Sequence, residues 1–206
     1  MGGTSSNITR SSRRGRGERD GNEGLRNVNI NRRKNKHDSL THLTINAQSL
    51  KYKMNELREL AFKHKPQIIA VTETWGNSNI DDINFMIRDY VMYRTDRLND
   101  RTSDAGGTLL YIHDKLGQRE CKPLNRPLNG IPFDSSTWCW VTPEIGKNVL
   151  VGCIYRSPSS LLSNNDSFLK LINQANDIAG RNRLLVLGDF NMPNINWEEW
   201  NHWEGS

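Results

Sequence analysis

The stretch Leu184-Leu185-Val186-Leu187-Gly188-Asp189-Phe190-Asn191 (LLVLGDFN) contains the pattern that decides the fold. Four consecutive apolar residues are typical of a strand that is buried on both faces, as in the parallel sheets of α/β proteins. The polar residues that follow stand at the carboxyl end of that strand, where the site residues of α/β folds usually gather. The stretch therefore predicts a buried strand over residues 184–187, with a candidate site at its end.

Two periodicities organise the chain before this stretch. His42–Asn46 (HLTIN) alternates polar and apolar residues as a strand does, whereas Met54, Leu57 and Ala61 recur at the spacing of one helix face. The same patterns predict strands over residues 67–72, 90–94, 107–113, 137–141 and 148–155, and helices over residues 51–64 and 166–179. This order favours an α/β fold in which two sheets pack face to face and are covered by helices.

Positive charge is concentrated in the first 38 residues. They hold ten basic and four acidic side chains, whereas residues 39–206 hold 18 basic and 19 acidic ones. The formal net charge of +5 therefore excludes a uniformly basic nucleic-acid-binding domain. With five apolar residues and no Phe, Trp or Tyr, residues 1–38 are predicted to be a basic disordered tail, followed by one domain over residues 39–206. The tail could bind the phosphates of DNA or RNA, and a solvated tail without function fits equally well.

Apolar stretches and cysteines limit the location of the protein. The longest apolar stretches, such as Val149–Tyr155, are far shorter than the roughly 18–20 residues of a membrane span. No secretory hydrophobic segment opens the chain. Cys121, Cys139 and Cys153 are odd in number and fit no zinc spacing, so we expect buried free thiols in a reducing, intracellular compartment.

Four of the predicted strands end in polar side chains that a core does not need. These residues are Asn46, Glu73, Tyr155, Arg156, Asp189 and Asn191. If the strands lie side by side, the groups converge into a set that suits phosphodiester hydrolysis. Glu73, with Asn46 beside it, could hold a magnesium ion, and Asp189 could orient or deprotonate the attacking water. Asn191, Tyr155 and Arg156 could hold the phosphate or offset charge in the transition state.

Each of these residues alone also fits an ordinary structural role. A carboxylate in a turn, an asparagine at a strand end and a half-buried tyrosine are common, and Asp189 and Asn191 could simply form a turn. Only their joint placement at strand ends indicates a site.

The motifs, taken in order, resemble a known superfamily. They are Asn46–Leu50 (NAQSL), Glu73–Trp75 (ETW), Gly106–Gly107 before a strand, Ile154–Pro158 (IYRSP) and Leu187–Asn191 (LGDFN). This set resembles the endonuclease/exonuclease/phosphatase superfamily, and within it the apurinic-like endonuclease domain of non-LTR retrotransposons. The resemblance covers roughly residues 39–200.

The resemblance implies a four-layer α/β sandwich, with two packed mixed sheets flanked by helices, and a magnesium-dependent hydrolase that could also use Mn²⁺. It implies that Asn46 and Glu73 lie at the metal, that Tyr155 contacts the phosphate, that Asp189 activates the water and that Asn191 helps to position it. In the retrotransposon members such a domain nicks target DNA in the nucleus, and the exposed 3′ end primes reverse transcription.

The sequence departs from the family pattern after Asn191. The second carboxylate pair and the Ser-Asp-His motif of the family do not follow, and His202 has no Asp before it. We therefore expect an α/β sandwich that is incomplete at the C-terminus, the N-terminal portion of an endonuclease domain, with little or no activity as it stands. The alternatives are a non-catalytic nucleic-acid-binding module that uses the basic arm, and another phosphoesterase of the same superfamily, acting on inositol phosphates or sphingomyelin.

Overall fold

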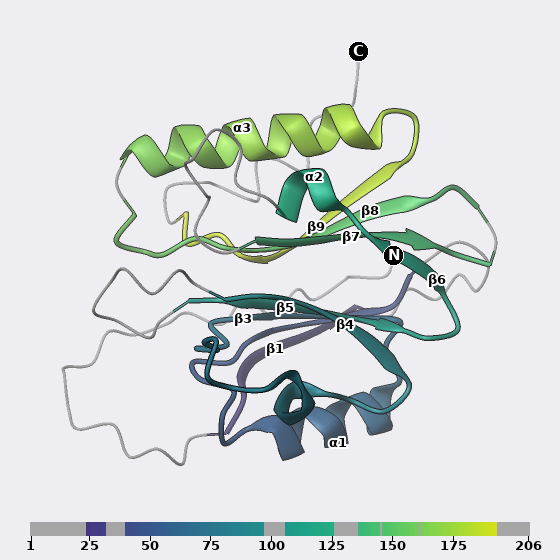
Figure 1. The fold of residues 1–206 in the computed structure, drawn as a ribbon, viewed down its shortest axis with the longest axis vertical. Helices are drawn as coiled ribbons and strands as arrows, with labels where there is room; N and C mark the ends of the chain where they lie inside the picture. Colours follow the sequence, from purple (N-terminus) through teal and green to yellow (C-terminus); the bar gives the residue numbers. More distant parts are fainter. Residues whose placement is uncertain are drawn as a thin grey trace, which may run out of the picture.

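A computed structural model describes residues 24–31, 40–96, 106–125, 136–144, 146–160 and 162–192, and its strands form two sheets packed face to face. Each sheet carries one long helix on its outer face, so the molecule has four layers (Figure 1). This arrangement confirms the predicted α/β sandwich of two mixed sheets flanked by helices. No helix of the described part is both long and apolar enough to cross a membrane.

The first sheet has five strands in the order β1-β2-β3-β5-β4. The strands are β1 (Arg26–Asn31), β2 (His42–Asn46), β3 (Ile68–Thr72), β4 (Tyr90–Thr95) and β5 (Thr108–His113). β2 and β3 are parallel, and α1 (Met54–His64) connects them as a crossover helix. A short 3-10 helix, η1 (Asp82–Phe85), lies between β3 and β4. Because β2 and β3 run in the same direction, Asn46 and Thr72 end at the same edge of the sheet.

The second sheet has four strands in the order β6-β7-β8-β9. The strands are β6 (Gly117–Glu120), β7 (Ser136–Thr142), β8 (Val149–Tyr155) and β9 (Arg183–Asp189). The short helix α2 (Lys122–Asn125) precedes β7, and α3 (Leu162–Ala179) connects β8 to β9, which are parallel. This second parallel pair places Tyr155 beside Asp189 in register.

The core between the sheets is made by the apolar runs that the sequence predicts as buried strands. Ile68 and Ala70 of β3 pack with Val151 and Cys153 of β8, and all four are fully buried. All three cysteines are buried free thiols, as expected. Burial raises the pKa of the Cys139 thiol to about 12, so that it stays protonated at neutral pH. Two large apolar surfaces thus fix how the sheets face one another.

The prediction of a disordered tail over residues 1–38 is wrong for β1. Residues Arg26–Asn31 pair antiparallel with β2, and Leu25, Val28 and Ile30 pack against the core of the first sheet. Averaging the composition over 38 mostly polar residues conceals the local alternation of Val28 and Ile30, which places both on one face. Residues 1–23 and 32–39 lie outside the described part, so the domain boundary at residue 39 stays a prediction.

Candidate active site

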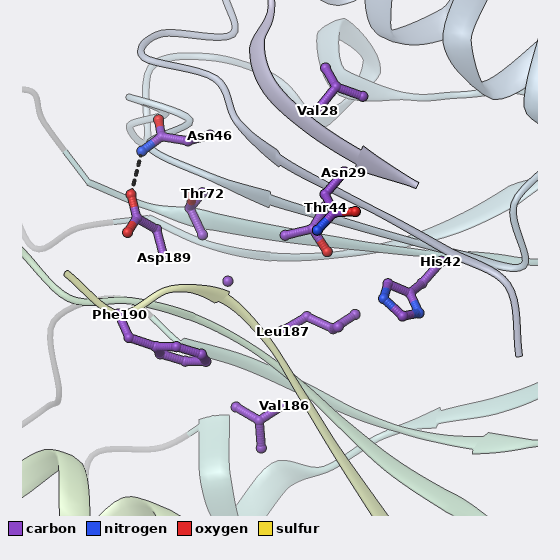
Figure 2. Close-up of a pocket in the computed structure, with 11 residues that line it drawn as sticks. Val28, Asn29, His42, Thr44, Asn46, Thr72, Val186, Leu187, Asp189 and Phe190 are labelled. Carbon is purple, nitrogen blue, oxygen red and sulfur yellow. Dashed lines mark hydrogen bonds between the residues drawn. The ribbon is translucent and has the colours of Figure 1, made fainter. Parts of the chain in front are cut away.

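The site lies where the carboxyl ends of the two parallel strand pairs meet. Asn46, the last residue of β2, donates from Nδ2 to Glu73 Oε1 at 2.7 Å and to Asp189 Oδ2 at 2.8 Å. Glu73 follows β3 of the first sheet and Asp189 ends β9 of the second sheet. One carboxamide group therefore joins a carboxylate from each sheet. Figure 2 shows its bond to Asp189.

The orientation of the Asn46 carboxamide is fixed by its other end. Asn46 Oδ1 accepts a hydrogen bond from the backbone N–H of Gln48 at 3.2 Å, and Asn46 is 9% exposed. Nδ2 therefore faces the two carboxylates. A bond from Oδ1 to a metal ion would require this carboxamide to rotate.

Tyr155 joins the two carboxylates from β8. Its phenol hydrogen-bonds to the Glu73 carboxylate. Burial, and then the negative charges of Glu73 and Asp189, raise the pKa of Tyr155 to about 12. The phenol is therefore neutral at physiological pH and remains a hydrogen-bond donor at this edge.

Asp189 is held by the sheet itself. Its backbone carbonyl accepts from the N–H of Arg156 at 2.9 Å, and its Oδ1 accepts from the N–H of Asn191 at 3.3 Å. The preceding residue must be glycine, since Gly188 has φ of 136° and a Cβ there would overlap the carbonyl oxygen of Ile154. The Gly-Asp-Phe-Asn run thus lets β9 approach β8 closely and delivers Asp189 at the strand end.

Glu73 is held by a turn rather than by a strand. Its φ is 53°, in the left-handed region that is uncommon for residues other than glycine. Its carbonyl accepts from the N–H of Ser49 at 2.9 Å, and the carbonyl of Thr74 accepts from Leu50 at 3.0 Å. On the other side, the N–H of Trp75 donates to Gly106 at 3.0 Å. The loop after β2 and the glycines before β5 therefore hold the turn from both sides. The sequence patterns do not predict these contacts.

The side chains of Arg156 and Asn191 bond to one another's backbone carbonyls instead of to the carboxylates. Arg156 Nη1 donates to the carbonyl of Asn191 at 2.7 Å, and Asn191 Nδ2 donates to the carbonyl of Arg156 at 2.7 Å. Arg156 Nε also donates to Asn165 of α3 at 3.0 Å, and Arg156 is 8% exposed. The structure thus places both residues as supports of the turn after β9, while their predicted role in binding phosphate stays a prediction.

A groove of about 650 Å³ leads away from Asn46 and Asp189 between the edges of the two sheets (Figure 2). On one side it is lined by β1 and β2, with Val28, His42 and Thr44, and on the other by β9 and Phe190. Burial lowers the pKa of His42, so the imidazole in this wall is neutral at physiological pH. The groove was not predicted, because the sequence patterns did not predict β1, which supplies Val28 and Asn29 to its wall.

The donor set fits a magnesium ion. Among the described residues, the hydrogen bonds to Glu73 and Asp189 come from neutral groups: Asn46, Tyr155 and the N–H of Asn191. A cation would offset the charge of the two carboxylates, and oxygen ligands are those that magnesium prefers. The described part contains no cluster of three or more His, Cys, Asp and Glu side chains that could hold a metal. A magnesium ion here would therefore retain water ligands, as it usually does.

The fold, with oxygen-bearing side chains converging where the two sheets meet, defines a protein of the α/β-sandwich class. The sequence profile of the Endonuclease/Exonuclease/phosphatase family matches residues 43–206, and the chain belongs to this family. Members of this family are typically magnesium-dependent. No curated protein matches the chain.

Solved structures share the fold at low sequence identity. The endonuclease domain of TRAS1, a telomere-specific non-LTR retrotransposon, is 17% identical with a TM-score of 0.55, over 74% of this chain and 61% of that chain. The catalytic domain of Xenopus laevis APE2 is 13% identical with a TM-score of 0.52, over 73% and 58%. The 3′ phosphatase NExo from Neisseria, bound to a product DNA hairpin, is 14% identical with a TM-score of 0.51, over 77% and 60%. The chain therefore spans less than two thirds of the length of each of these structures.

Proposed function

We propose that this site hydrolyses phosphodiester bonds of DNA with a magnesium ion held at Glu73, with Asn46 beside it. The observation that supports this most directly is the Asn46 amide, which joins carboxylates from both sheets. An anionic phosphate cannot approach two carboxylates without a cation between them. Manganese, which takes similar oxygen ligands, is expected to substitute for magnesium.

Each side chain of the site has a separate role in the proposed hydrolysis. Bound magnesium supplies positive charge that stabilises the phosphate oxygens. Asp189 orients the attacking water and accepts its proton, because hydrogen bonds to both carboxylate oxygens fix its position. Tyr155 stays protonated, and its single O–H, which faces Glu73 in the structure, would turn to donate to a phosphate oxygen when the substrate binds. Asn191 and Arg156 hold the turn after Asp189, and Asn191 also helps to position the water.

The finer proposal is nicking of target duplex DNA for the reverse transcriptase of a non-LTR retrotransposon, which would take place in the nucleus. The motifs Asn46–Leu50 and Ile154–Pro158 support this branch, and the TRAS1 endonuclease domain shares the fold. The basic arm would add contacts to DNA or RNA. The 206 residues contain no Ser-Asp-His motif, so we expect weak nicking or none from this chain alone.

Metal binding tests the site without depending on turnover. Titration of the 206-residue chain with Mn²⁺, followed by the electron paramagnetic resonance signal of the free ion, should give a binding isotherm. Glu73→Ala should weaken that binding about tenfold or more. Glu59→Ala, which removes an exposed carboxylate from α1, is the matched control and should leave it unchanged. Equal Mn²⁺ affinity in wild type and Glu73→Ala contradicts the proposed metal site.

Substrate assays separate the remaining alternatives. Supercoiled plasmid with Mg²⁺ should show nicking at or slightly above background, and any nicking should disappear in Glu73→Ala. DNA binding without any Mn²⁺ site would instead indicate a binding module that uses the arm, because such binding would depend on salt and not on Glu73. Hydrolysis of inositol phosphates without hydrolysis of DNA would indicate another phosphoesterase of the family.

A further inference from the structure

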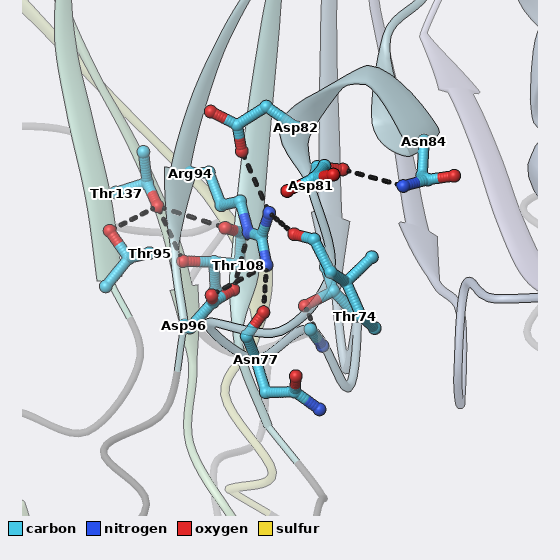
Figure 3. Close-up of polar contacts among 12 residues, drawn as sticks. Thr74, Asn77, Asp81, Asp82, Asn84, Arg94, Thr95, Asp96, Thr108 and Thr137 are labelled. Atoms are coloured by element: carbon cyan, nitrogen blue, oxygen red, sulfur yellow. Dashed lines mark hydrogen bonds and ion pairs between the residues drawn. The ribbon is translucent and has the colours of Figure 1, made fainter.

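Arg94 of β4 is surrounded by the loop that follows Glu73 (Figure 3). Its Nη2 donates to the carbonyl of Asn77 at 2.7 Å, and its Nη1 donates to the carbonyl of Ile80 at 2.7 Å and to Asp82 Oδ1 at 2.8 Å. Asn77 and Ile80 are otherwise part of an irregular segment between β3 and η1. One side chain on a strand thus donates to two carbonyls of this loop and to the first residue of η1.

The remaining donors of Arg94 go to Asp96. Nε donates to Oδ1 and Nη2 donates to Oδ2, each at 2.7 Å. With these two bonds, all five N–H groups of the guanidinium have an acceptor. The side chain of Arg94 is 12% exposed, and its guanidinium lies 4.8 Å from the centre of the Phe85 ring. Arg94 is therefore fully engaged within the protein and has no free donor for a substrate.

Gly76 brings the Arg94–Asp96 pair next to the turn that carries Glu73. A Cβ at Gly76 would lie 2.7 Å from Asp96 Oδ1 and 3.3 Å from Arg94 Nη2, so the backbone runs directly against the ion pair. The N–H of Gly76 also donates to Thr74 Oγ1 at 3.3 Å. Only two residues, Thr74 and Trp75, lie between Glu73 and Gly76, and both Glu73 and Trp75 have positive φ.

We propose that Arg94 is a positioning residue for the metal ligand Glu73. By bonding the carbonyls of Asn77 and Ile80 and pairing with Asp96 beside Gly76, it fixes the far end of the turn whose near end carries Glu73. This inference rests on the proposed function, because it assigns a metal to Glu73. Arg94 acts through the backbone and touches neither metal nor substrate.

A turn with two residues at positive φ needs such support. Uncommon backbone conformations persist only where the surroundings over-determine them. Hydrogen bonds from Ser49 and Leu50 hold the first half of the turn, and Arg94 holds the second half. Without Arg94, the carbonyls of Asn77 and Ile80 lose a donor, and the Glu73 carboxylate samples more positions relative to Asp189.

Mn²⁺ affinity of the 206-residue chain, measured by the resonance signal of the free ion, tests this inference. Arg94→Met, which keeps an unbranched side chain but removes all of its donors, should weaken Mn²⁺ binding about tenfold. Gly76→Ala disturbs the same Arg94–Asp96 pair from the side of the loop, and it should also weaken Mn²⁺ binding. Arg88→Met is the matched control, since Arg88 is 94% exposed and pairs with Asp89 only at 3.7 Å, and its affinity should equal that of wild type.

If Arg94 had a purely structural role, Arg94→Met would lower the melting temperature without changing Mn²⁺ affinity. Leu171→Ala is the reference for such a result, because it removes a buried side chain of α3 on the other sheet. If Arg94→Met and Gly76→Ala bind Mn²⁺ as wild type does, the inference is wrong although the proposed function stands. If wild type shows no Glu73-dependent binding, both are wrong. Should Arg94→Met fail to fold, Arg94→Lys, which cannot supply five donors in one plane, and Gly76→Ala decide the question by the same criterion.

Discussion

The two halves of the site hold their carboxylates in different ways. In each half a buried arginine donates to backbone carbonyls of the segment that follows the carboxylate: Arg94 to Asn77 and Ile80 after Glu73, and Arg156 to Asn191 after Asp189. Arg94 is also ion-paired with Asp96 and Asp82. The bonding partners of Arg156 are a carbonyl and the carboxamide of Asn165, both neutral.

The backbone explains this difference. Asp189 is still in register with Tyr155 in a parallel pair, so the ladder of β8 and β9 positions it directly. Glu73 lies one residue beyond β3, with positive φ, and depends on contacts from neighbouring loops. A carboxylate inside a strand therefore needs a close strand–strand approach, whereas one in a turn needs side chains that fix the loop.

The largest effect is expected where the second half depends on that close approach. Gly188→Ala should lower the free energy of unfolding by about 3 kcal/mol or more, because its Cβ overlaps the Ile154 carbonyl and its φ of 136° is unfavourable for alanine. Urea denaturation measures the change. Gly180→Ala is the control: its φ is 55°, but its Cβ would meet only the Asp177 carbonyl at 3.8 Å, so about 1 kcal/mol should be lost.

Equal losses in these two variants would contradict the view that β9 must approach β8 closely. They would mean that the conformation of glycine alone matters at both positions. A much larger loss at Gly188 would instead confirm that Asp189 is delivered by strand packing.

The next largest effect concerns the two arginines. Arg156→Met should lower the free energy of unfolding by about 1–3 kcal/mol, because it takes this donor from the partly buried Asn191 carbonyl. The partners of the Arg156 side chain among the described residues are neutral. The loss of unfolding free energy should therefore be the same in roughly 0.05 M and 1 M NaCl, although screening of charge pairs differs strongly between these concentrations. The loss in Arg94→Met should be smaller at high salt, because Asp82 is 68% exposed and its attraction is screened. Losses with identical salt dependence would remove the distinction between the two halves.

Tyr155 reports on both halves at once. Its pKa is raised to about 12 by burial and then by the charges of Glu73 and Asp189. Because the pKa in the folded state exceeds the ordinary value of about 10, the stabilisation is fully present below pH 10 and is lost as the pH rises through 12. The difference in ultraviolet phenolate absorbance between wild type and Tyr155→Phe isolates this titration from those of the other tyrosines.

Neutralising one carboxylate at a time compares the halves. Glu73→Gln should lower the pKa of Tyr155 more than Asp189→Asn does. The charge of Glu73 raises that pKa more than the charge of Asp189 does, and Glu73 also accepts the phenol hydrogen bond. A larger shift in Asp189→Asn would show that Tyr155 belongs with the second half.

The sequence could predict those parts of the fold and the site that follow from strand patterns. Ile68–Val71 and Leu184–Leu187 are apolar throughout and lie in buried or partly buried strands, and parallel strands end at one edge. That reasoning brings Asn46, Glu73, Tyr155 and Asp189 together, as the structure does.

Side-chain directions and irregular segments could not be predicted in the same way. A residue at a strand end can turn toward the site or toward its own turn, and Arg156 and Asn191 turn toward each other. The partners of Arg94 lie in a polar loop without periodicity, so no pattern connects them. β1 was not predicted, because its two apolar residues stand among many polar ones and change the local composition little.

The smallest effect concerns Asp82 and Asp96, the two carboxylates that pair with Arg94. Asp82→Asn should change the free energy of unfolding by only about 0–0.5 kcal/mol, because the side chain is 68% exposed and the amide oxygen can still accept from Arg94. Asp96→Asn should cost more, since Asp96 is 24% exposed and accepts from Arg94 with both oxygens, one of which becomes an NH₂ group facing a donor. Thermal and urea unfolding of both variants shows which substitution costs more stability, and Mn²⁺ affinity is measured alongside. If Asp82→Asn proves as costly as Asp96→Asn, the exposed ion pair and not the bidentate pair beside Gly76 holds the Glu73 turn, and the support of the first half lies at the surface of the loop.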